Sequence, residues 1–250
     1  MHRFFVPPES LRGGKAEITG PQVHQIRSVL RMGPGDQFTV LDDSGWEYQV
    51  EIEGVDRERL EARILNKKLA TSEPRTKITL YQAVLRAQNF EWVLQKGTEL
   101  GVVEFVPIIT ERCVISALDD VSESKLQRWR RIIQEAAEQS GRGRLPRLRP
   151  VLLFPQGCER ARHSDLALIP WEEEHRTTLH SVLSSYSANW RPFSVSVFVG
   201  PEGGFTRKEM DHARRYGIIP VTMGPRVLRA ETAAMAMTAA LFYEFGDWGW

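Results

Sequence analysis

The chain has 250 residues, of which 42% are hydrophobic and 26% are charged, as in ordinary globular proteins. Its 33 basic and 32 acidic residues give a formal net charge of +1, which excludes a globally basic nucleic-acid-binding surface and leaves only local patches. This length allows one large domain or two, with a core that needs no disulfide or metal to support it.

The apolar segments and the cysteine content narrow the class further. The longest nearly apolar run, residues 233–243, is 11 residues long, whereas a membrane span needs about 20. The opening residues MHRFFVPPES lack the apolar stretch of a secretory signal. Cys113 and Cys158 are the only cysteines, and the histidines lack metal-ligand spacing. We therefore expect a cytoplasmic protein with no membrane segment, disulfide or metal site.

Residues 1–72 are predicted to form a small β-rich unit. Its strands are expected at residues 4–6, 37–41, 47–52 and 60–65. A helix between the first two strands is predicted to begin at a capping box formed by Thr19 and Gln22, and to stop at Gly33. The polar segment 66–77 is the best candidate for a domain boundary.

Strands and helices alternate over residues 73–250. Strands are predicted at residues 78–85, 102–109, 166–170, 195–199 and 218–223. Helices are predicted at residues 89–100, 122–140, 176–185, 208–216 and 231–245. Because apolar strands that alternate with helices form layered α/β folds, this part predicts a mostly parallel sheet.

A glycine-rich loop follows the strand at residues 195–199. It reads Gly200-Pro-Glu-Gly-Gly204, and Thr206 with Glu209 predicts a capping box for the next helix. In open α/β sheets, ligands bind beyond the carboxyl ends of strands, where glycine lets the backbone approach them. A tight turn without a ligand explains these residues equally well.

A second Gly-Pro turn, Gly224-Pro225, follows the last predicted strand. Arg226 and Arg229 come after it, and Glu231 and Thr232 lie at the start of the last helix, where free N–H groups carry partial positive charge. A capped helix with solvated arginines would explain this segment alone. Two such turns close together, each with acidic and basic residues, favour a shared ligand pocket.

Basic residues gather in two segments of the second half. Residues 122–150 contain eight basic and three acidic residues, and residues 205–229 contain six basic and two acidic. A local excess of positive charge in a nearly neutral chain suits a polyanion such as RNA or DNA, although a solvated charged surface is the simpler alternative.

Several motifs together resemble the ribosomal RNA small-subunit methyltransferase E family. They are LQKGTELGV (94–102), ERC (111–113), EAAEQSGR (135–142), GPEGG (200–204) and MGPRVLRAETA (223–233). Residues 24–36 are similar to the PUA-like domain of that family. The resemblance implies an α/β fold with a PUA-like RNA-binding domain at residues 1–72 and a SPOUT methyltransferase domain, closed by a trefoil knot, at residues 73–250.

The resemblance also implies an activity and partners. The chain would be a homodimer that uses S-adenosyl-L-methionine to methylate N3 of one uridine in 16S rRNA of the small ribosomal subunit. A SPOUT-type ribose 2′-O-methyltransferase and a non-catalytic RNA-binding module remain as alternatives. Binding of S-adenosylmethionine would exclude the module, and the modified nucleoside would separate the two enzymes.

By resemblance, three loops would bind the cofactor. Their residues are Leu168, Ile169, Pro170 and Glu172; Val199, Gly200, Pro201, Glu202, Gly203 and Gly204; and Met223, Gly224, Pro225, Val227 and Leu228. The candidate RNA-binding residues are Arg27, Arg31, Arg142, Arg144 and Arg147.

The candidate catalytic residues are Arg229, Glu231 and Thr232. Uracil N3 must lose a proton before or during attack, so Arg229 could stabilise the charge that develops on the carbonyl oxygens. Glu231 could accept the proton, or it could instead anchor Arg229 or the start of the helix.

Overall fold

The computed structural model describes residues 2–115, 117–186 and 190–248, and its contacts divide the chain into two compact units. One unit consists of Met1–Glu73 together with Gln134–Leu145, and the other of Pro74–Ile133 and Pro146–Trp250. The chain therefore returns to the first unit after the second has begun. No helix in the described part of the chain is both long enough and apolar enough to cross a membrane.

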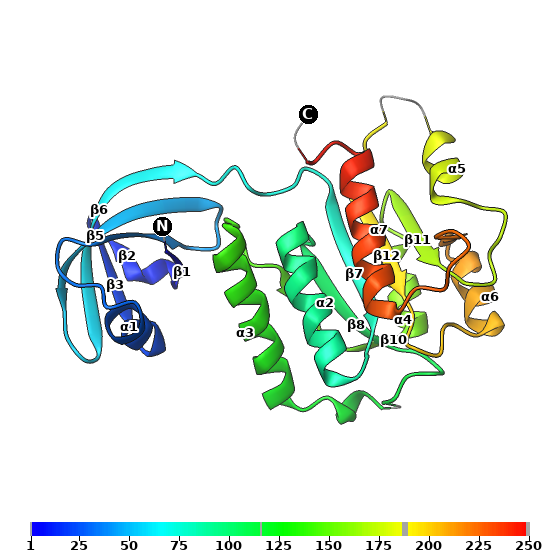
Figure 1. Ribbon diagram of the computed structural model, residues 1–250, viewed down its shortest axis with the longest axis horizontal. Helices are drawn as coiled ribbons and strands as arrows, with labels where there is room; N and C mark the ends of the chain where they lie inside the picture. Colours follow the sequence, from blue (N-terminus) through cyan, green and yellow to red (C-terminus); the bar gives the residue numbers. More distant parts are fainter. Residues whose placement is uncertain (1, 116, 187–189, 249–250) are drawn as a thin grey trace. The chain divides into compact units, whose positions relative to one another are not determined.

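Residues 1–73 of the first unit, coloured blue to cyan in Figure 1, contain a six-stranded sheet. Its strand order is β1-β4-β5-β6-β3-β2. The strands are β1 (Arg3–Phe5), β2 (Leu11–Arg12), β3 (Lys15–Thr19), β4 (Gln37–Leu41), β5 (Trp46–Val55) and β6 (Arg59–Leu69). The helical turns are η1 (Pro8–Ser10), α1 (Pro21–His24) and η2 (Gln25–Val29). Neighbouring strands are antiparallel except β1 and β4. Apolar residues such as Phe4, Phe38 and Val50 form its core.

The β-rich character predicted for the N-terminal part is confirmed, with corrections at three places. The predicted helix does not begin at a Thr19 capping box, because Thr19 ends β3 opposite Arg59 and Gly20 is the N-cap with φ of 75°. Strand β3 itself was not predicted. The polar residues 66–69 continue β6, where the Lys67 ammonium lies 4.4 Å from the Trp46 ring centre.

An ion pair between the buried Arg142 and the half-buried Glu73 holds residues 134–145 in the first unit. The guanidinium of Arg142 donates to Glu73 at 2.7 Å, and Glu73 also accepts the backbone N–H groups of Gly143 and Arg144. Burial alone would raise the pKa of Glu73, but the hydrogen bond and the charge of Arg142 outweigh it and lower the pKa. Arg142 is only 3% exposed, so the prediction that it binds RNA phosphate is wrong: its guanidinium is committed to Glu73.

We expect Arg142→Ala to lower the free energy of unfolding by about 3 kcal/mol, the low end of the range for breaking a buried ion pair, because it leaves the half-buried Glu73 carboxylate without its counter-charge. Urea titration would measure the loss, with Arg12→Ala on an exposed strand as the control. Since the folded pKa of Glu73 lies below its ordinary 4.5, the stabilisation is present above that pH and is lost as the pH falls through the folded value. A variant as stable as the wild type would contradict this reading.

The second unit is built on a seven-stranded, all-parallel sheet in the order β10-β8-β7-β12-β11-β13, with β9 also beside β8. The strands are β7 (Lys77–Ala83), β8 (Glu104–Ile109), β9 (Arg147–Leu148), β10 (Leu152–Leu153), β11 (Leu166–Pro170), β12 (Ser194–Val199) and β13 (Ile219–Val221). The helices are α2 (Ala87–Leu100), η3 (Leu118–Asp120), α3 (Glu123–Ser140), α4 (Phe154–Ala161), α5 (Leu179–Ser184), α6 (Arg207–Arg215) and α7 (Ala230–Glu244). The predicted parallel α/β sheet is confirmed.

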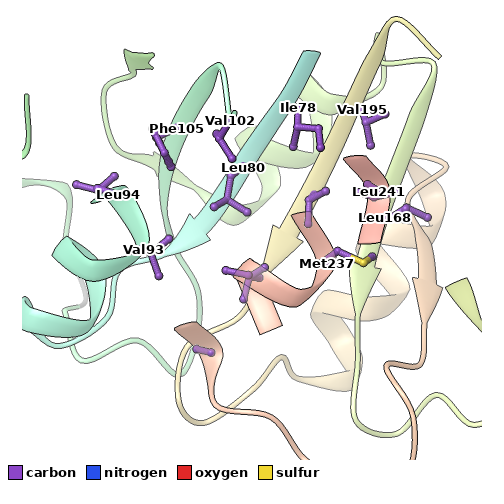
Figure 2. Close-up of a cluster of buried hydrophobic side chains, with 14 of the residues drawn as sticks. Ile78, Leu80, Val93, Leu94, Val102, Phe105, Leu168, Val195, Met237 and Leu241 are labelled. Atoms are coloured by element: carbon purple, nitrogen blue, oxygen red, sulfur yellow. The ribbon is translucent and has the colours of Figure 1, made fainter. Parts of the chain in front are cut away.

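Both faces of this sheet are covered, because alternate strand residues point to opposite sides. Ile78 and Leu80 of β7 pack with residues of α2 and α7, among them Leu94 and Met237 (Figure 2). On the other side, Tyr81 belongs to a second cluster with residues of α4 and α6. The β7 strand is therefore apolar along most of its length, which is why it was recognisable in the sequence.

The short elements of this unit were not all predicted. The sequence gives no clear signal for helix α4, because its eight residues include Pro155 and Gly157, which both have low helix propensity. Gly157 allows the helix to pack closely on the sheet, since a Cβ there would lie only 3.3 Å from the Ile108 side chain. Strands β9 and β10 are two residues each and leave no periodic signal. The predicted capping box is confirmed: Thr206 accepts from the Glu209 N–H, and Glu209 accepts from the Thr206 N–H.

Candidate active site

Three loops meet at the carboxyl edge of the parallel sheet. Strand β11 lies between β12 and β13, so the loops that follow these three strands leave the sheet side by side. They surround a cavity of about 710 Å³. This volume lies within the range of about 300–1,000 Å³ that small-molecule and cofactor sites occupy.

Most of the predicted site residues line this cavity. They are Pro170, Glu172, Val199, Gly200, Pro201, Glu202, Gly203, Gly204, Met223, Gly224, Pro225, Val227, Leu228, Arg229 and Glu231. Leu168 and Ile169 do not, because their side chains are fully buried in the two cores on either side of β11. Thr232 is exposed on α7 and is not part of the lining.

The glycines bring the loop backbones close to their neighbours. Gly204 has φ of 68°, and a Cβ on it would lie 2.8 Å from a carboxylate oxygen of Glu172. Its N–H donates to the Pro201 carbonyl at 2.9 Å, which closes a tight turn. Gly224 has φ of 100° and faces open space. Gly204 is required both for its positive φ and for its close contact with Glu172, whereas Gly224 is required for its positive φ alone.

Two residues with ionisable side chains lie at the start of α7, where they line the cavity. Arg229 is the N-cap residue, and its exposed side chain has no hydrogen bond or ion pair within the described residues. Glu231 follows in the first turn, and its Oε2 atom is buried without a hydrogen-bond partner in the described part of the chain. No interaction joins the two side chains there, so the alternative in which Glu231 anchors Arg229 is not observed.

The cavity also contains residues that sequence reasoning missed. They are Arg86, Asn89, Arg112, Val114, Trp171, His175, Phe205, Thr222, Ala230 and Ala233. Arg226, which the sequence already placed at the second Gly-Pro turn, also lines the cavity. Arg86 follows β7, and Arg112 and Val114 follow β8, so two further loops contribute. The motif at residues 111–113 was the available signal, but nothing in the sequence indicated that β8 ends near the glycine loop.

Comparison with known proteins identifies relatives along the whole chain. Residues 71–242 match the family model of the RNA methyltransferase domain, and residues 18–65 match that of the RNA methyltransferase PUA domain. Ribosomal RNA small subunit methyltransferase E of Bacillus subtilis is 31% identical over 248 residues, which cover 98% of this chain and 97% of the relative.

Two solved structures are similar over nearly the same length. The crystal structure of ribosomal RNA small subunit methyltransferase E from Neisseria gonorrhoeae, bound to S-adenosyl methionine, is 30% identical, with a TM-score of 0.85 and coverage of 97% of both chains. A methyltransferase from Legionella pneumophila, in complex with the same cofactor, is 33% identical, with a TM-score of 0.86 and coverage of 96% of both chains. The chain therefore belongs to the ribosomal RNA small subunit methyltransferase E family.

Proposed function

We propose that this enzyme uses S-adenosylmethionine to methylate N3 of a uridine in 16S rRNA, with a PUA-like domain at residues 1–72 and a knotted SPOUT domain at residues 73–250. The observation that carries the proposal is the cavity lined by both Gly-Pro loops and by Arg229 and Glu231. Relatives of the same length are named as small-subunit rRNA methyltransferases. Because that substrate is made in the bacterial cytoplasm, we propose that the enzyme acts there.

The residues of the cavity fit the proposed cofactor. The backbone of Gly200, Gly203 and Gly204 lines it, and Gly224 leaves open space where any other residue would place a side chain. Two solved relatives hold S-adenosylmethionine. When bound, the cofactor supplies an electrophilic methyl group. The loops after β12 and β13 would hold it, and Pro170 and Glu172 would close the third side.

Two residues at the start of α7 would serve the nucleobase. Glu231 has a buried carboxylate oxygen without a hydrogen-bond partner among the described residues, and this group would accept the N3 proton. Arg229 lines the cavity with N–H donors that no described residue occupies, and it would stabilise the negative charge on O2 and O4 that this deprotonation creates. Thr232 remains a candidate at the same helix start.

Nucleoside analysis tests the function directly. We expect mass spectrometry of 16S rRNA incubated with the enzyme and S-adenosylmethionine to detect 3-methyluridine at one site. A 2′-O-methylated nucleoside would instead establish the ribose methyltransferase. A chain that binds rRNA but not S-adenosylmethionine would be a non-catalytic RNA-binding module.

We propose that the exposed arginines Arg27, Arg31, Arg144 and Arg147 contact rRNA phosphates. Arg31→Gln and Arg147→Gln should each weaken rRNA binding and reduce its salt slope by about one, because each removes one phosphate contact. Binding isotherms at several salt concentrations would measure the slope. Arg59→Gln, which changes an arginine that is ion-paired with Glu17, is the control and should keep the wild-type slope. An unchanged slope would mean that these arginines form only a solvated surface.

We propose a homodimer, supported by the apolar surface of α7. Met237 and Leu241 of this helix are buried in the core, yet Ala236 and Ala240 are only half-buried and Tyr243 is 66% exposed. Light scattering at micromolar concentration should give twice the chain mass of 28.6 kDa. The mass of a single chain would contradict the proposal.

A further inference from the structure

The loop that follows β8 is tied to the glycine loop that follows β12. These strands are not neighbours, because β7 lies between them in the sheet. The connection therefore has to cross the end of β7, and the side chain of Arg112 spans this gap: its Nη1 donates to the Gly203 carbonyl at 2.8 Å. A Cβ on Gly203 would lie 3.2 Å from the Arg112 Cβ, which is too close for an ordinary contact, so a larger residue at position 203 would press against Arg112.

A second set of contacts fixes the base of the same connection. The Glu111 N–H donates to the Glu209 carboxylate at 2.9 Å, and the Thr206 hydroxyl donates to the Glu111 carboxylate at 3.2 Å. Glu209 is 9% exposed and also accepts the Thr206 N–H at 2.8 Å. The turn that carries Arg112 is closed by the Cys113 N–H, which donates to the Thr110 carbonyl. Arg112 thus extends from a turn that is held by the start of α6, outside residues 200–204.

We propose that Arg112 is a positioning residue that holds the glycine loop, residues 200–204, in the conformation that receives the cofactor. This inference rests on the proposed function. The Gly203 carbonyl is the loop atom that Arg112 contacts, and Gly203 itself lines the cavity. A loop that is already ordered loses less conformational freedom on binding, so its affinity for a ligand is higher. Docking of Arg112 on an RNA phosphate is the alternative outcome.

The test measures cofactor binding in the absence of RNA. In calorimetry with S-adenosylmethionine we expect Arg112→Ala to raise the Kd about 10–100-fold, the effect of losing one hydrogen bond to a charged group. Arg112→Lys should bind the cofactor more tightly than Arg112→Ala but less tightly than the wild type, because lysine is shorter and carries one ammonium nitrogen in place of the planar guanidinium. Arg130→Ala, which removes an exposed arginine of α3 outside the cavity lining, is the matched control and should bind as the wild type does.

Amide hydrogen exchange gives a readout that does not depend on activity. Without cofactor, Arg112→Ala should speed exchange at Gly204, whose N–H donates to Pro201, and leave the amides in the middle of α6 unchanged. An unchanged cofactor Kd together with weaker rRNA binding would overturn the inference and make Arg112 a phosphate contact. A wild-type chain that fails to bind S-adenosylmethionine would instead refute the proposed function itself.

Discussion

Arg229→Ala is expected to lower kcat by about 10²–10³, the usual loss when one donor to a developing oxyanion is removed. The guanidinium lines the cavity, is exposed, and has no partner within the described residues, so nothing else in that part of the chain uses its donors. Neutral uracil needs little from this charge, whereas the deprotonated ring spreads negative charge onto O2 and O4. The effect should therefore fall on kcat and kcat/KM alike, with the Kd for S-adenosylmethionine nearly unchanged.

Steady-state kinetics from neutral to alkaline pH would test this role. Higher pH should partly rescue Arg229→Ala, because solvent then supplies more deprotonated uridine. Arg229→Lys keeps the charge without the guanidinium fork and should retain part of kcat. If Arg229→Ala instead loses affinity for rRNA or for the cofactor at constant kcat, the residue is a docking contact.

Glu231→Gln should reduce the methylation rate by about 10²–10⁴, the range attributed to a positioned general base. Glutamine keeps the shape of the side chain and removes its ability to accept a proton. The buried Oε2 atom of Glu231 has no hydrogen-bond partner in the described part of the chain, which is an unfavourable arrangement for the folded protein alone. We therefore expect Glu231→Gln to be at least as stable as the wild type while it loses activity.

Single-turnover assays and thermal melts on the same samples would separate the two effects. Glu244 is exposed at the end of the same helix, so Glu244→Gln serves as the control and should methylate at the wild-type rate. A variant that loses stability in proportion to activity would show that Glu231 supports the helix start. Full activity in Glu231→Gln would mean that the N3 proton leaves to water.

Features written in a few consecutive residues could be predicted from the sequence. The strand at residues 166–170 has the predicted bounds, and Thr206 and Glu209 cap α6 as their spacing indicated. The two Gly-Pro loops line one cavity because their strands, β12 and β13, both pair with β11. These signals are local, because an apolar run, a helix cap or a turn can be recognised from a few neighbouring residues alone.

Features that depend on tertiary contacts could not be predicted. Arg142 looked like a phosphate ligand because it follows a helix in a basic segment, but its partner Glu73 lies far away in the sequence. Thr19 has the spacing of a helix cap, yet pairing with Arg59 keeps it in a strand. Arg112 follows β8, which is not a neighbour of β12, and it reaches the cavity only because its side chain crosses the end of β7 to Gly203.

The return of residues 134–145 to the first unit has a consequence for protein engineering. In that unit, Ala137 of α3 is fully buried in a small cluster with Phe5 and Leu41, and Arg142 neutralises Glu73. The N-terminal unit is therefore discontinuous in the gene and cannot be excised as a single cassette. A fragment that stops at Glu73 would expose the apolar side chains that Ala137 covers and leave the Glu73 carboxylate without its counter-charge. A working graft of this unit onto another enzyme would have to carry both segments, joined by a new linker.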